Sequence, residues 1–92
     1  MKRFAFISRH EPTPGQIALA AAEGIELVAV GDRDAFTIDA AEFAGFEGAV
    51  VVHPAAALKL YYAGLGIGIF ENAARPAEGG KPAFEAKALH LF

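Results

Sequence analysis

Five runs of mainly apolar residues are spaced along the chain, and each is of a length that predicts a β-strand. The runs are Arg3–Ser8, Ile25–Val30, Ala49–Val52, Leu65–Phe70 and Phe84–Phe92. β-branched and aromatic residues recur in them, and such side chains favour a pleated, buried position. The second run is interrupted only by Glu26, which is typical of a parallel strand covered on both faces.

A helix is predicted directly after the first strand. Thr13 and Gln16 have the spacing of a capping box, and Pro14 suits the first helical position. The helix continues through Ala21, and Gly24 follows as its C-terminal cap.

A second helix is predicted over Ala55–Ala63, with Pro54 in its first turn. Apolar residues occur nearly all round this helix, and only Lys59 interrupts them. A helix without a clear polar face is expected to be buried, for instance in a dimer interface. A short third helix is predicted over Ile38–Ala44.

The alternation of strands and helices predicts an α/β fold, a small Rossmann-like open sheet in a single domain spanning residues 1–92. We expect four to five mostly parallel strands, two main helices and a C-terminal edge strand. The polar segment Glu71–Pro82 is longer than a usual connection, which favours a loop with a binding or lid role.

The amino-acid composition argues against several classes of protein. The chain has 92 residues, 54% of them apolar, a net charge of −3 and no cysteine. Disulfides and thiolate metal sites are therefore excluded, and a protein that coats long nucleic acid would usually be basic. The start of the chain lacks a signal-peptide pattern, and no apolar run approaches the ~20 residues of a membrane span. These features predict a cytoplasmic protein without membrane contact.

The candidate site follows from the expected topology. Right-handed crossovers allow the second strand on one side of the first and the third strand on the other, and ligands of open α/β sheets bind at such a switch point. Helix N-termini there attract anions. The candidate ligand-binding residues are Ser8, Arg9, His10, Glu11, Thr13, Gln16, His53, Pro54, Asn72, Arg75 and Lys81, and the candidate catalytic residues are Arg9, His10 and His53.

Structural roles compete with these functional ones. Thr13 and Gln16 can simply cap a helix, and Arg9 can pair with Glu11. His10 can be a solvated side chain and His53 a histidine bonded to backbone. Asn72 can merely end a strand, and Arg75 and Lys81 can be solvated loop charges. The functional interpretation rests on two histidines and an arginine falling at the one edge that the topology makes suitable for a ligand.

Several common sites are disfavoured. The three histidines have no metal-ligand spacing, no glycine-rich phosphate loop follows the first strand, and no serine lies in a nucleophile elbow. Ser8–Thr13 does resemble the arginine–histidine signature of the histidine phosphatase superfamily, although Glu11 replaces its glycine. This similarity supports an alternative, a phosphate-transferring enzyme using His10. Another is a non-enzymatic module, such as a phage or plasmid inhibitor, that docks on a protein through its apolar helix.

A broader resemblance covers most of the chain. The first segment, Ile7–Gln16, has a histidine followed by a Thr-Pro helix start. The second, Val51–Ala57, is the end of a strand that leads into a Pro- and Ala-rich helix. In the third, Arg75-Pro76 precedes the strand introduced by Lys81–Glu85. In this order the segments resemble the small CARF-related accessory proteins of type III CRISPR systems.

The resemblance implies a homodimer that binds a cyclic oligoadenylate, such as cyclic tetra-adenylate, across its two-fold axis. It implies no cofactor and an antiviral-defence role in damping type III CRISPR signalling. The group contains ring nucleases as well as pure binders. A ring nuclease would cleave without metal, by attack of a ribose 2′-hydroxyl, with Arg9 on the phosphate and His10 or His53 moving protons.

Overall fold

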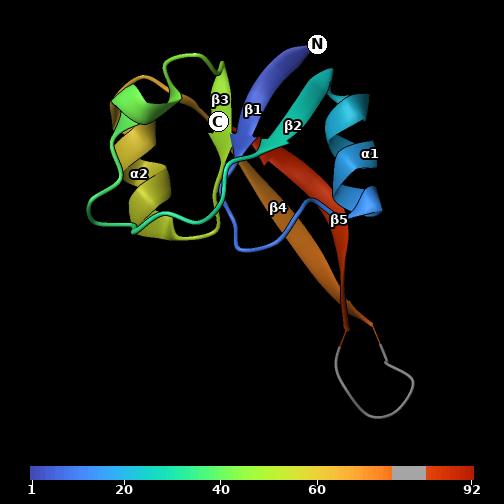
Figure 1. The fold of residues 1–92 in the computed structure, drawn as a ribbon. Coiled ribbons are helices and arrows are strands. Elements are labelled where there is room, and N and C mark those ends of the chain that lie inside the picture. Colours follow the sequence, from blue (N-terminus) through green and yellow to red (C-terminus); the bar gives the residue numbers. More distant parts are fainter. Residues whose placement is uncertain (76–82) are drawn as a thin grey trace.

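The computed structural model describes residues 1–75 and 83–92 as a five-stranded sheet with helices on its faces (Figure 1). The elements are β1 (Lys2–Phe6), α1 (Pro14–Ala22), β2 (Ile25–Ala29), a short 3-10 helix η1 (Ala40–Phe43), β3 (Gly48–Val50), α2 (Pro54–Tyr62), β4 (Gly66–Arg75) and β5 (Ala83–Leu91). The strand order is β2-β1-β3-β4-β5. The first four strands are parallel and β5 is antiparallel to β4, so the expected mostly parallel α/β sheet with a C-terminal edge strand is confirmed.

The two faces of the sheet bury different side chains of β1. Phe4 and Phe6 pack in a cluster with Ala20 of α1, whereas Ala5 belongs to a cluster with Leu60 of α2. Successive residues of a strand point to opposite faces, so this division places the two helices on opposite sides of the sheet, as Figure 1 shows. No helix in residues 1–75 or 83–92 is long and apolar enough to cross a bilayer.

Two glycines on neighbouring strands make room for the Phe4 ring. Gly48 of β3 is the register partner of both Phe4 and Gly66. A Cβ on Gly48 would lie 2.5 Å from the ring of Phe4 and 2.7 Å from the carbonyl oxygen of Gly66. The absence of a side chain at Gly48 and Gly66 therefore leaves room for the Phe4 ring.

The segment Glu71–Arg75, expected as loop, is strand instead, because β4 continues to Arg75 and pairs with β5. The resulting hairpin extends well beyond the other strands (Figure 1). Its register shifts between Glu71 and Asn72, so that Lys87 is an extra residue in β5, and such a bulge increases the local twist. Residues 76–82, with the proposed lid and Lys81, lie outside the described part of the chain.

Within one copy of the chain, α2 buries only the side that faces the sheet, and burial of its remaining surface in a dimer interface stays a prediction. Ala56, Ala57 and Leu60 face the sheet and are buried, whereas Leu58 and Tyr61 are half exposed and Tyr62 is 81% exposed. A helix on one face of a sheet buries only one stripe, so the remaining apolar residues of α2 face outward.

Candidate functional site

A cleft of about 570 Å³ lies where β1 and β3 end. Its wall includes six polar side chains, Ser8, Arg9, His10, Asp32, Arg33 and His53. The apolar residues Ile7, Ile38 and Val51 also line it. Because β1 lies between β2 and β3, this is the switch point of the sheet, and the cleft is within the range of roughly 300–1,000 Å³ of small-molecule sites.

The loop after β1 contributes Arg9, the more exposed of the two arginines that line the cleft. The backbone N–H of His10 donates to Ser8 Oγ at 3.2 Å, which closes a tight local turn. Arg9, 84% exposed, reaches across the cleft wall, where its Nε lies 3.4 Å from Asp32 Oδ2. An exposed ion pair of this kind contributes only about 0–1 kcal/mol, so an anionic ligand can replace Asp32 as the partner of Arg9.

The turn after β2 contributes Asp32 and Arg33, which the sequence reasoning did not select. Arg33 Nη1 donates to the carbonyl oxygens of Val30 at 2.8 Å and Asp32 at 3.0 Å, and its Nε lies 3.3 Å from Glu42 Oε1. Arg33 thus ties the end of β2 to η1. The available signal was the charged run Gly31–Asp34 directly after a strand that ends at the same edge.

His53 is the N-cap of α2. Its Nδ1 accepts the backbone N–H of Ala55 at 3.1 Å, so the neutral ring carries its proton on Nε2. The ring also makes an edge contact with Phe36, with centroids 5.8 Å apart. Because Nδ1 is occupied by the cap, the capped ring presents Nε2–H to a ligand as a hydrogen-bond donor.

Replacing the cap tests this geometry. We expect His53→Ala to lower the free energy of unfolding by about 1 kcal/mol, because the N–H of Ala55 loses its acceptor. His53→Asn should restore most of this loss, since asparagine caps well. Urea unfolding measures both variants, and equal stability of the alanine and asparagine proteins would contradict the capping role.

The structure separates three other candidate residues from the cleft. Glu11 does not line it, and Thr13 and Gln16 form the capping box of α1. Thr13 Oγ1 accepts the N–H of Gln16 at 3.2 Å, and Gln16 Oε1 accepts the N–H of Thr13 at 3.0 Å. The side chains of Thr13 and Gln16 are therefore used within the helix itself.

Two further candidates, Asn72 and the backbone of Arg75, lie in β4, and Lys81 lies outside the described residues. The third histidine, His90, pairs with Glu71 across the strands, and its Nε2 lies 2.8 Å from Glu71 Oε1. Within residues 1–75 and 83–92, no group of three His, Asp or Glu side chains is arranged to hold a metal ion.

The cleft can therefore recognise an anion more readily than it can hold a metal. Arg9 and the two imidazoles supply N–H donors, and one carboxylate, Asp32, opposes them. Ser8 adds a hydroxyl, and the apolar floor excludes water from one side of a bound group. Guanidinium and imidazole donors on a small cleft are typical of phosphate or carboxylate recognition.

Comparison with known proteins adds no relative to this description: no family model matches the chain, and no curated protein or solved structure matches it significantly.

Proposed function

We propose that the cleft binds a phosphate group of a cyclic oligoadenylate, cyclic tetra-adenylate in the first instance. The observation that carries the proposal is the meeting of Arg9, His10 and His53 at one cleft of the switch point. Two of these residues come from the loop after β1 and one from the N-cap of α2. The class of ligand rests on the resemblance of segments Ile7–Gln16 and Val51–Ala57 to the CARF-related accessory proteins.

In this proposal Arg9 moves from Asp32 to the ligand phosphate. A guanidinium binds phosphate through two parallel N–H donors, whereas its present contact with Asp32 is a single, exposed 3.4 Å approach. Two copies of the chain hold one ring, because a two-fold symmetric ligand presents the same phosphate to each subunit. Binding of the ring by a homodimer withdraws the messenger from type III CRISPR signalling.

Cleavage in the same cleft extends the proposal. The ribose 2′-oxygen forms a bond to the adjacent phosphorus while the bond to the 5′-oxygen breaks. One histidine takes the proton of the 2′-hydroxyl and the other gives a proton to the leaving 5′-oxygen, so the products are a 2′,3′-cyclic phosphate and a free 5′-hydroxyl. His10 is the base, because with Nδ1 in the helix cap Nε2 of His53 already carries a proton. His53 is the acid as the doubly protonated ring, a form in which Nδ1 no longer accepts the N–H of Ala55.

Removing the Arg9 guanidinium tests the binding site. We expect Arg9→Ala to weaken cyclic tetra-adenylate binding roughly tenfold to a hundredfold, the value of a hydrogen bond to a charged group. Lys2→Ala is the matched control, since Lys2 lies at the start of β1 and the cleft lies beyond the other end of that strand. Titration calorimetry measures both. No binding by the unmodified protein, or equal affinities of the two variants, would contradict the proposal.

The cleavage step has its own assay. Protein and cyclic tetra-adenylate are incubated with excess chelator, and mass spectrometry looks for linear products ending in a 2′,3′-cyclic phosphate. His53→Asn, which keeps the helix cap, should retain binding and lose turnover. If the protein binds cyclic tetra-adenylate and the nucleotide ring stays intact, the function is limited to binding.

A further inference from the structure

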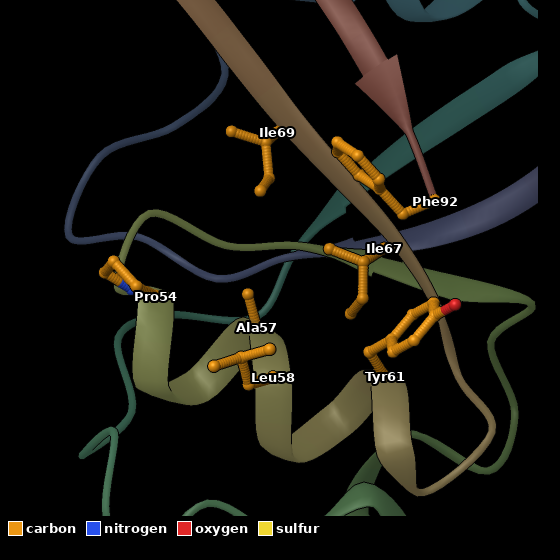
Figure 2. A pocket seen from close by; sticks show the side chains of 7 residues that line it. All are labelled: Pro54, Ala57, Leu58, Tyr61, Ile67, Ile69 and Phe92. Atoms are coloured by element: carbon orange, nitrogen blue, oxygen red, sulfur yellow. The ribbon is translucent and has the colours of Figure 1, made fainter.

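A second hollow, here called the apolar groove, lies between α2 and the β4–β5 hairpin. It measures about 300 Å³ and is lined by Pro54, Leu58 and Tyr61 of α2, by Ile67 and Ile69 of β4, and by Phe92 at the chain end, with Ala57 at its floor. Figure 2 shows these side chains facing one another from the helix and the sheet. Leu58, Tyr61 and Phe92 are each more than half exposed, so an occupant can reach them.

The apolar groove begins where the polar cleft ends. Pro54 lines both hollows, so the two share a wall at the start of α2. From Pro54 the groove follows α2 to Tyr61, a path of about 10 Å at about 1.5 Å per residue. A ligand with a charged group in the cleft can therefore place an attached group of one ring system in the groove.

The chemistry of the groove selects an uncharged occupant. All its lining residues have apolar or aromatic side chains. On the neighbouring hairpin the carboxylate of Glu71 is already paired, since it lies 2.8 Å from His90 and 3.4 Å from Lys87. The hydrogen bonds from His90 and Lys87 lower the pKa of Glu71, so its carboxylate stays charged and satisfied at neutral pH.

We propose that the apolar groove is the subsite for an adenine base of the ligand whose phosphate occupies the polar cleft. This inference rests on the proposed function. Tyr61 and Phe92 offer aromatic surface at the far end of the groove, and base–aromatic contacts suit a flat, uncharged ring. The open side of the groove leaves the polar edge of the base in water, so burial leaves no unsatisfied polar group.

The test compares two neighbouring tyrosines. Tyr61 lines the groove, whereas Tyr62 is 81% exposed and does not line it. We expect Tyr61→Ala to weaken cyclic tetra-adenylate binding about 5- to 100-fold, as for loss of one stacked base. Tyr62→Ala should stay within about twofold, and Tyr61→Phe, which keeps the ring, should restore most of the affinity. Titration calorimetry measures affinity, and light scattering measures oligomeric state on the same samples.

The outcomes separate this inference from the function on which it rests. No binding by the unmodified protein overturns both. Binding that depends on Arg9 but is equal in Tyr61→Ala and Tyr62→Ala overturns the base subsite and leaves the phosphate site standing. If Tyr61→Ala changes the oligomeric state without changing the affinity for each site, a second copy of the chain occupies the groove and the base subsite is likewise overturned.

Discussion

Replacing Phe43 with alanine should lower the free energy of unfolding by about 3–5 kcal/mol. Phe43 is 1% exposed and belongs to the cluster that also contains Ile38 and Leu60. Its ring lies 6.5 Å from that of Phe46, centroid to centroid. Truncation removes the buried ring and leaves a cavity that the surrounding sheet and helix cannot fill by small movements.

The size of this loss matters because the domain is small. At about 0.05–0.15 kcal/mol per residue, a chain of 92 residues has a total stability of roughly 5–14 kcal/mol. Phe43→Ala therefore removes about a fifth of it or more. Urea unfolding followed by circular dichroism measures the change. Phe36→Ala is the control, since Phe36 is 77% exposed, and it should cost less than about 1 kcal/mol. Equal losses for the two variants would contradict the packing described.

Phe43 also supports the cleft indirectly. Its neighbour Glu42 lies 3.3 Å from Arg33, and Arg33 lines the cleft beside Asp32. Loosening η1 should therefore disturb the turn after β2 as well as the core.

A methyl group on Gly48 is expected to destabilise the sheet by about 1–3 kcal/mol. The new Cβ would overlap the Phe4 ring at 2.5 Å and the Gly66 carbonyl oxygen at 2.7 Å. Phe4 is 7% exposed and packed against α1, so neither it nor the backbone of β4 can move away cheaply.

Gly45→Ala is the matched control for this prediction. A Cβ on Gly45 meets no atom within 4 Å, and its backbone does not have the positive φ that favours glycine. We expect its melting temperature to stay close to that of the unmodified protein while that of Gly48→Ala falls by several degrees. A Gly48→Ala protein as stable as Gly45→Ala would mean that the Phe4 ring is not seated on β3.

Much of the fold follows from local patterns in the sequence. The capping box at Thr13 and Gln16, the proline at the start of each main helix and the buried apolar strands are signals that act within a few residues. Right-handed parallel crossovers allow the observed strand order, with β2 and β3 on opposite sides of β1, without selecting it on their own. The extension of β4 over Glu71–Arg75 was missed because the polar Glu71 and Asn72 become strand only through pairing with β5.

Only part of the candidate site could be predicted, because strand topology places some of its residues and contacts between side chains place others. Ser8, Arg9, His10 and His53 each follow a strand that ends at the switch point, so topology alone brings them together. The position of Arg33 depends on its ion pair with Glu42, and no rule on the spacing of residues in the sequence predicts that pair. The exposure of Tyr61 depends on how far α2 lies from the hairpin, and the helical pattern of apolar residues contains no measure of that separation.

Cyclic tetra-adenylate can be mapped onto the protein by the changes it causes in backbone amide NMR shifts. If the polar cleft is the binding site, we expect the largest changes at Ser8–His10, at Asp32 and Arg33, and at Val52 and His53. Smaller changes should follow along α2 as far as Tyr61. Unchanged spectra at saturating ligand, or changes confined to residues away from the ends of β1 and β3, would contradict binding in the polar cleft.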